Sequence, residues 1–220
     1  MESKTKPLGM RIGESVFSLG YLVFAWTAGI ILLLRGCTVS GIMILVLGGG
    51  DSFHLVPRIV DNLFPLKRRS FFLGLGNLIS SITMTVFYIL LFFAVFEMCS
   101  VKGTDYTAFD KFVIISLSVL GAVRIALCLV PSNKWFDGKG NAKWSVIRNV
   151  PFAVMGLFAV AWLIYKSITL SWNVTLLAVL VVLSFGFYIP VVLFARKRPM
   201  IGMLMIPKTI CYIVMICIFL

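Results

Sequence analysis

Long apolar runs, separated by short polar stretches, divide the chain into seven segments. Each run holds roughly 18 to 25 residues, which at ~1.5 Å of helical rise per residue is enough to cross ~30 Å of hydrocarbon. The expected spans are residues 14–34, 39–63, 71–98, 111–131, 149–166, 172–195 and 200–219. Because the connections are short, the pattern predicts one all-α domain over residues 1–220, a polytopic bundle of seven transmembrane helices.

The composition supports this interpretation and excludes a soluble domain. Hydrophobic residues make up 60% of the 220 positions, and the mean hydropathy is +1.06. A soluble domain needs many more charged residues than this to cover its surface. The chain is therefore expected to be an integral, multi-pass membrane protein.

The formal net charge of +12 would suggest a nucleic-acid partner in a soluble protein, but here its distribution has another explanation. Thirteen basic residues fall at one set of span ends: Lys4, Lys6, Arg11, Lys67, Arg68, Arg69, Lys134, Lys139, Lys143, Arg148, Arg196, Lys197 and Arg198. The opposite ends carry only Arg35, Lys102, Lys111 and Lys166. By the positive-inside rule, this predicts a cytoplasmic N-terminus and an outer C-terminus, in a bacterial inner (plasma) membrane, with no nucleic-acid partner.

The cysteines and the histidine give no metal or cofactor signal. The five cysteines show no CxxC spacing, and the chain has a single histidine. A zinc site needs at least three good protein ligands, so neither a metal nor another cofactor is expected. Cys37 and Cys99 both fall near the predicted outer surface, where they could pair in an oxidising compartment or stay free.

The second span contains a polar stripe within the stretch "GGGDSFHLVPR" (48–58). Asp51, His54, Arg58 and Asp61 follow one another at intervals of three, four and three residues, which places them on one helical face. Ionised side chains cost several kcal/mol against lipid. The stripe is therefore expected to face the interior of the bundle.

Polar residues of other spans are expected at a similar depth. Counted from the predicted cytoplasmic ends, His54, Arg124 and Lys208 all lie roughly 10 to 15 Å into the membrane at helical rise. The candidate ligand-binding residues are Asp51, His54, Arg58, Tyr88, Arg124, Asn149, Tyr188, Lys208 and Tyr212. Cationic groups outnumber acids in this layer, and arginine offers forked donors, so the expected ligand is an anion.

Prolines occur shortly before the cytoplasmic ends of three spans, in "HLVPRI" (54–59), "CLVPSN" (128–133) and "FYIPVV" (187–192). A proline removes one backbone donor and frees the carbonyl four residues earlier, which must find another partner in lipid. Prolines at similar depth in three helices therefore favour a pocket that water reaches from the cytoplasmic side.

The leading functional hypothesis is a protein that binds and transports an anionic small molecule or lipid headgroup, with membrane lipids as partners. A second hypothesis is an intramembrane lipid-modifying hydrolase or transferase that uses His54 and Asp51 as acid and base. A channel gated by the same two residues is a third. In a structural reading, Asp51 would instead pair with Lys208 or Arg124, and Asp61 with Arg58.

A more remote hypothesis comes from a limited resemblance to the microbial rhodopsins. The seventh span has a lysine midway, Lys208, and the sixth contains "FYIP" (187–190). The resemblance implies a chromophore receptor in which retinal is attached to Lys208. The chain departs from that family in the third span, which has no acid at mid-membrane depth to serve as counterion.

Overall fold

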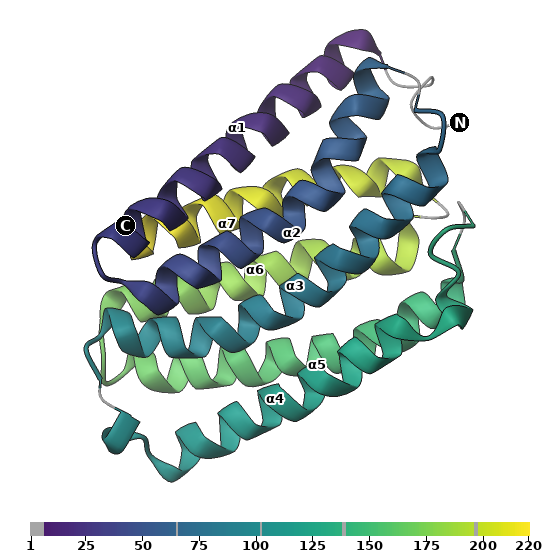
Figure 1. Ribbon diagram of the computed structural model, residues 1–220. Helices are drawn as coiled ribbons and strands as arrows, with labels where there is room; N and C mark the ends of the chain where they lie inside the picture. The colour runs from purple at the N-terminus through teal and green to yellow at the C-terminus, as the bar shows by residue number, and fades with distance from the viewer. Residues whose placement is uncertain (1–6, 65, 102, 138–139, 196–197) are drawn as a thin grey trace.

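Seven long helices run side by side, alternately up and down, in the computed structural model (Figure 1). The structure describes residues 7–64, 66–101, 103–137, 140–195 and 198–220. Within these ranges the helices are α1 (Leu8–Leu34), α2 (Thr38–Leu63), α3 (Arg69–Met98), α4 (Ala108–Leu129), α5 (Ala142–Ser167), α6 (Trp172–Phe194) and α7 (Met205–Phe219). The described connections contain three short 3-10 helices: η2 (Gly103–Asp105), η3 (Pro131–Asn133) and η4 (Pro199–Leu204). The described residues contain no strand, so the predicted all-α, seven-helix fold is confirmed.

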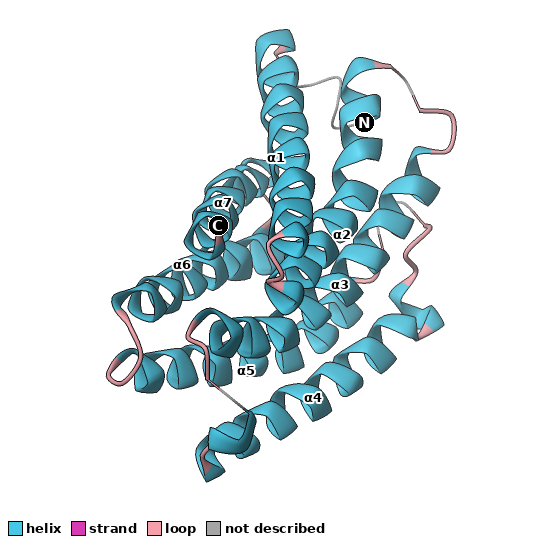
Figure 2. Cartoon of the chain, turned by 60° about the vertical axis from the view of Figure 1, so that its left-hand side comes forward, coloured by secondary structure: helices cyan, strands magenta, loops and turns pink. Residues whose placement is uncertain are grey.

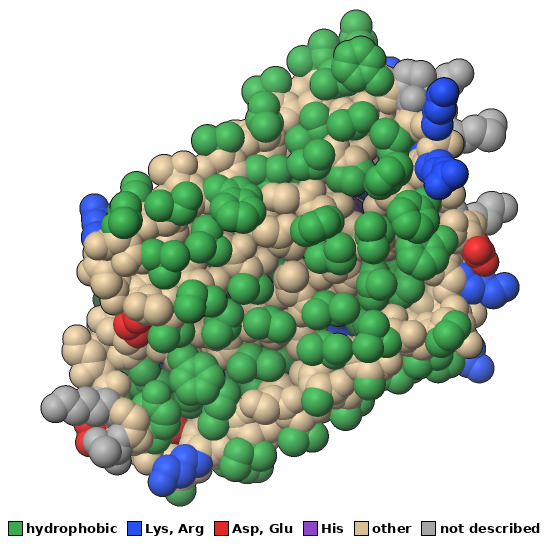
Figure 3. Space-filling model, in the orientation of Figure 1, with side chains coloured by type: hydrophobic (Ala, Val, Ile, Leu, Met, Phe, Trp, Pro, Cys, Tyr) green, Lys and Arg blue, Asp and Glu red, His purple; other side chains and the backbone are tan. Residues whose placement is uncertain are grey.

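All seven spans in the described ranges are long and apolar enough to cross a membrane, the last one combining most of η4 with α7. Figure 3 shows hydrophobic side chains over the long face of the bundle and charged side chains gathered at its two ends. An apolar belt between polar ends is the surface that a bilayer requires. The structure fits a multi-pass membrane protein.

The helices form a closed arrangement in which each packs on the next, and α7 returns to pack on α1. Helices α1 and α4 lie at opposite edges of the bundle, as both views show (Figures 1 and 2). Helix α3 contacts α5 as well as its neighbours in the chain, which places it near the centre. Helix α1 begins at one end of the bundle and α7 ends at the other (Figure 1).

We call the end at which α1, α3 and α5 begin the basic end. The described residues of the predicted cytoplasmic set are Arg11, Lys67, Arg68, Arg69, Lys134, Lys143, Arg148 and Arg198. The others, Lys4, Lys6, Lys139, Arg196 and Lys197, lie outside the described residues. That the basic end faces the cytoplasm stays a prediction from the charge distribution.

Two helices begin well before the apolar runs that predicted them. Helix α1 starts at Leu8 and α5 at Ala142. The side-chain oxygen of Asn141 accepts hydrogen bonds from the backbone N–H of Lys143 (3.1 Å) and Trp144 (3.5 Å), and thereby caps α5. Hydropathy marks only the lipid-facing part of a helix, whereas the cap sets where the backbone starts to turn.

At the end of the bundle opposite the basic end, a glutamate of α3 binds the first turn of α2. Glu97 accepts hydrogen bonds from the backbone N–H of Val39 (2.9 Å) and Ser40 (2.7 Å) and from the Ser40 hydroxyl (2.7 Å). These N–H groups belong to the first turn of α2, where a negative charge also interacts favourably with the helix dipole. Glu97 therefore fixes the start of α2 to the end of α3.

A buried ion pair joins α4 to α5 at the same end. Lys166 Nζ lies 2.8 Å from Asp110 Oδ2, and Trp162 Nε1 donates to Asp110 Oδ1 at 2.7 Å. Asp110 also receives hydrogen bonds from the backbone and side chain of Thr107, as part of the capping box at the start of α4. The carboxylate is fully buried, so four donors compensate its desolvation.

Cys37 and Cys99, considered above as a possible pair, are both free thiols. Cys99 follows the last residue of α3. Burial raises the pKa of the Cys99 thiol, because it disfavours the charged thiolate. The neutral thiol is the less reactive form.

Helices α2 and α3 approach each other closely beside a proline. Pro57 lies inside α2 and removes the hydrogen bond to the carbonyl of Phe53. Gly76 of α3 lies against this carbonyl: a Cβ atom at that position would collide with Phe53 O and come within 2.9 Å of His54 Cα. The absence of a side chain on Gly76 therefore sets the distance between α3 and the polar stripe of α2.

Replacing Gly76 by alanine is expected to destabilise the protein by about 1–3 kcal/mol, because the new methyl group must push the α2 backbone away. The measurement is the unfolding midpoint of the purified variant in mild detergent. Gly186→Ala is the matched control, since a Cβ there meets nothing within 4 Å. Equal stability of the two variants would contradict the close contact between Gly76 and the α2 backbone.

Candidate functional site

A cavity of about 820 Å³ lies in the half of the bundle nearest the basic end, and residues of all seven helices line it. Seven of the nine predicted site residues are among them: Asp51, His54, Arg58, Arg124, Asn149, Tyr188 and Lys208. The other two, Tyr88 and Tyr212, are buried behind its wall, and the Tyr88 ring packs edge-on against Phe152, which does line the cavity. Side chains of α2, α4, α5, α6 and α7 thus share one chamber.

Arg124, which lines the cavity, is only 1% exposed. Arg124 donates from Nη1 to Thr85 Oγ1 (3.0 Å) and from Nη2 to Asn149 Oδ1 (3.4 Å). Its guanidinium carbon lies 3.4 Å from the centroid of the Phe152 ring. Its Nε has no hydrogen-bond partner, and no carboxylate oxygen of the described residues lies within 4.0 Å of the group. A buried charge in this state is incompletely compensated.

The two side chains that accept from Arg124 are themselves held in place. The Thr85 hydroxyl donates to the carbonyl of Ser81 (2.9 Å). Asn149 donates from Nδ2 to the carbonyl of Ser145 (2.8 Å), and its Oδ1 accepts a second hydrogen bond from the Tyr188 hydroxyl (2.8 Å). The guanidinium is therefore oriented by neutral partners that have other hydrogen bonds of their own.

The second deep cation comes from α7. Lys208 is 7% exposed, and its Nζ lies 5.0 Å from the ring centroid of Tyr188 and 4.8 Å from that of Tyr212. Both distances allow a cation–π interaction. Asp51 acts on Lys208 through its charge, but the described part of the chain places no carboxylate oxygen within 4.0 Å of Nζ. Lys208 is thus a cation that lies against two aromatic rings, with Asp51 as a more distant acid.

The acid of the α2 stripe bonds across the bundle to α1. Asp51 Oδ2 accepts a hydrogen bond of 2.7 Å from the Tyr21 hydroxyl, and Asp51 also interacts with Ser80. One turn along α2, His54 interacts with Asn77, while its buried Nδ1 has no partner. Among the hydrogen bonds of the described residues, none joins Asp51 to His54, so these two do not form an acid–base pair.

Charges nearer the basic end pair with one another. Arg69 Nε lies 2.7 Å from Asp61 Oδ2, and Arg58 Nη1 lies 3.9 Å from Glu14 Oε1. From the sequence we considered an ion pair between Asp61 and Arg58, and this prediction was wrong. Helix α3 starts beside the end of α2, so Arg69 is the residue that reaches Asp61. These pairs leave the excess positive charge at the deep end of the cavity.

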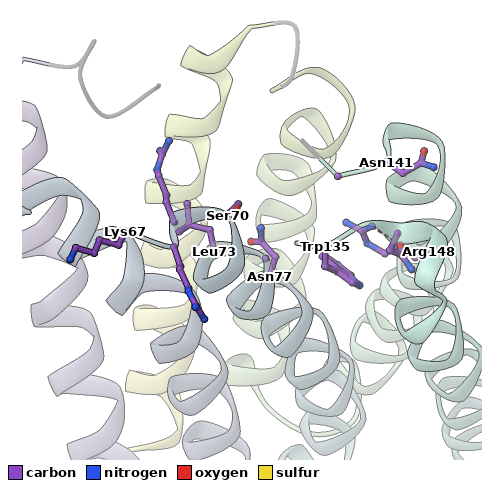
Figure 4. Close-up of a pocket in the computed structure, with 12 residues that line it drawn as sticks. Lys67, Ser70, Leu73, Asn77, Trp135, Asn141 and Arg148 are labelled. Atoms are coloured by element: carbon purple, nitrogen blue, oxygen red, sulfur yellow. Dashed lines mark hydrogen bonds between the residues drawn. The ribbon is translucent and has the colours of Figure 1, made fainter. Parts of the chain in front are cut away.

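A smaller pocket of about 440 Å³ adjoins the cavity at the basic end (Figure 4). Five residues line both: Arg69, Leu73, Asn77, Trp135 and Arg148. The Arg148 guanidinium lies 4.0 Å above the Trp135 ring, and its Nη1 donates to Asn133 Oδ1 at 2.8 Å. Lys67, at the other side of the view, points away from these residues. The pocket is thus a polar neighbour of the cavity at the basic end.

Sequence reasoning missed the contribution of α1. Tyr21 binds Asp51, and Glu14 lies beside Arg58. Ser15, Ser18 and Tyr21 are all buried and follow one another at intervals of three residues. That spacing marks an inward-facing side of α1 and could have identified it.

Comparison of the chain with models of protein families, with curated proteins and with solved structures gives no match in any of the three.

Proposed function

We propose that the protein binds an anionic small molecule or a lipid headgroup in this cavity and moves it across the membrane. The observation that carries the proposal is Arg124, which is buried in the cavity wall with an unpartnered Nε and no carboxylate within 4.0 Å in the described ranges. An arginine fork is well suited to carboxylate and phosphate oxygens. A bound anion would provide the missing counter-charge.

Lys208 of α7 adds a second positive charge to the same cavity. The side chains of Asn149 and Tyr188 fix the direction of the guanidinium before any ligand arrives. Such pre-organisation lowers the entropy lost on binding. In this proposal Arg124 and Lys208 hold the anion, and Asp51, bonded to Tyr21, balances part of the remaining charge when the cavity is empty.

Transport is supported by the shape of the helices around the cavity. Prolines lie inside α2, α5 and α6, and the seventh span begins as the 3-10 helix η4 before it continues as α7. Interrupted helices with a polar site between them are typical of carriers. The far half of the bundle is packed with aromatic side chains such as Phe92 and Trp162, so release on that side needs a second conformation.

The orientation and location in this proposal rest on the charge distribution. The bias of basic residues toward one end supports uptake from the cytoplasmic side of a bacterial inner membrane. The lipid-modifying enzyme is supported only by the unpartnered Nδ1 of His54, because Asp51 bonds to Tyr21 and does not orient the imidazole. Binding of an anion is therefore the better-supported function.

Replacing Lys208 by glutamine is expected to remove most of the stabilisation that an anion confers on the protein. At a concentration 100 times Kd, a ligand stabilises the folded state by about 2.7 kcal/mol. The measurement is thermal unfolding in mild detergent during titration with phosphate, sulfate and short carboxylates.

The charge-matched control is Lys111→Gln, since Lys111 is exposed and is absent from the cavity wall. This control is expected to keep the full response. A wild-type protein that no anion stabilises, or a Lys208→Gln variant that responds like the wild type, would overturn the proposed function.

A further inference from the structure

The cavity has two chemically different walls. The charged groups come mainly from α2 to α5 and from Lys208. Helix α1, the end of α6, η4 and the start of α7 contribute mainly apolar side chains, beside Glu14 and Ser18 of α1. Members of this apolar wall are Met10, Phe17, Val191, Met200, Met203 and Met205. Five of the chain's ten methionines line the cavity. Methionine is unbranched and flexible, so a wall of this kind adapts to an aliphatic chain.

The apolar wall includes two glycines that lie beside open space, one on α1 and one on η4. Gly13 of α1 and Gly202 of η4 both line the cavity, and a Cβ atom at either position would meet nothing within 4 Å. Beside them, Met200 is 75% exposed and Met203 is 39% exposed. We call the space between Gly13 and Gly202 the side opening. Gly13 is itself exposed, so this space lies at the surface of the bundle.

We propose that the ligand is an anionic amphiphile, a phosphate or carboxylate head joined to an aliphatic chain. This inference rests on the proposed function and names its ligand class. The head binds Arg124 and Lys208, and the chain lies along the apolar wall and leaves through the side opening. A small hydrophilic anion would use only the charged wall and would leave the methionine-lined part of the cavity without a ligand group.

The test compares ethyl, hexyl and decyl phosphate as ligands of the purified full-length protein at one fixed maltoside concentration. Affinity is obtained from the shift of the unfolding midpoint. Each methylene that is buried is expected to tighten binding by up to about fourfold, and competition from the micelle reduces this gain. Decyl phosphate is therefore expected to bind at least about 100-fold more tightly than ethyl phosphate.

Decanol and decyltrimethylammonium control for partition of the chain alone, and neither is expected to stabilise the protein. Equal affinity for ethyl and decyl phosphate would overturn the amphiphile but leave the proposed anion site in place. Stabilisation by decanol equal to that by decyl phosphate would also overturn it. If no phosphate binds, both the amphiphile and the proposed function fail.

Variants at the side opening test the path of the chain. Gly13→Leu and Gly202→Leu are each expected to weaken decyl phosphate binding at least about tenfold and to leave ethyl phosphate binding unchanged. Gly20→Leu is the matched control, because Gly20 lies on α1 with nothing within 4 Å and does not line the cavity. If both opening variants keep the wild-type preference for long chains, the proposal is wrong.

A last comparison identifies the source of the amphiphile. Didecanoyl phosphatidic acid carries the same head as decyl phosphate but two chains. Tighter binding of the two-chain lipid supports the proposal with a membrane phospholipid as ligand. Tighter binding of decyl phosphate supports it with a single-chain amphiphile instead.

Discussion

Replacing Arg124 by methionine is expected to abolish anion binding without destabilising the anion-free protein. The guanidinium is buried without a carboxylate partner in the described chain, so its desolvation is incompletely offset. Buried charged groups that are replaced by apolar side chains of similar volume often leave a protein equally stable or more stable by about 1–4 kcal/mol. We expect a change in that range for the empty protein, and a loss of anion affinity of at least about 100-fold, since each charge-assisted hydrogen bond contributes about 1.5–3 kcal/mol.

The neighbours of Arg124 make this outcome possible. When the guanidinium is removed, Thr85 keeps its hydrogen bond to the Ser81 carbonyl, and Asn149 keeps the one from Tyr188. No buried polar group among these neighbours is left without a partner, so the usual penalty for truncating a buried hydrogen bond is avoided.

The unfolding free energy of the Arg124→Met variant, measured with and without phosphate, tests the stability of the empty protein and the loss of anion binding separately. Arg35→Met is the control, because Arg35 is exposed and lies at the far end of α1. A variant at Arg124 that loses several kcal/mol in the absence of phosphate, yet responds to phosphate like the wild type, would show that the arginine is structural.

Replacing Asp110 by asparagine is expected to destabilise the protein by about 3–5 kcal/mol, because it leaves the ammonium of Lys166 buried and unpaired. Lys166 is 7% exposed, and its Nζ lies 2.8 Å from the carboxylate. Asparagine still offers an acceptor to Trp162, so the substitution mainly removes the charge. The response to anions is expected to survive, since this cluster lies at the end of the bundle away from the cavity.

A double variant tests whether the unpaired charge causes the loss. Adding Lys166→Met to Asp110→Asn removes the ammonium and is expected to recover most of the lost stability. Wild-type stability of the single variant would mean that Lys166 does not need the carboxylate. Recovery in the double variant together with an intact anion response would assign the two ends of the bundle to separate roles.

The fold was predictable because a bilayer requires long apolar helices, and such helices appear in the sequence as long runs of high hydropathy. The exact starts of helices could not be predicted in this way, because local backbone hydrogen bonds determine them. Helix α5 begins at Ala142 because Asn141 caps it, within a polar stretch that hydropathy ignores. The seventh span divides into η4 and α7, although its apolar run is continuous.

The candidate site was predictable as far as helical periodicity and depth determine it. The spacing of Asp51 and His54 placed them on one face of α2, and both line the cavity. Their partners could not be predicted, since a contact between helices depends on which helices are neighbours. Tyr21 reaches Asp51 because α1 packs on both α2 and α7, an arrangement that no spacing within one segment reveals.

The positions of the prolines are expected to make the half of the bundle next to the basic end less rigid than the opposite half. Pro57, Pro151 and Pro190 each remove a backbone hydrogen bond inside a helix, in the half next to the basic end. In the opposite half, the carboxylates of Glu97 and Asp110 hold neighbouring helices together. We therefore expect bending around the cavity, with the opposite half as a more rigid base. Amide hydrogens in that base are the ones that should exchange most slowly with solvent.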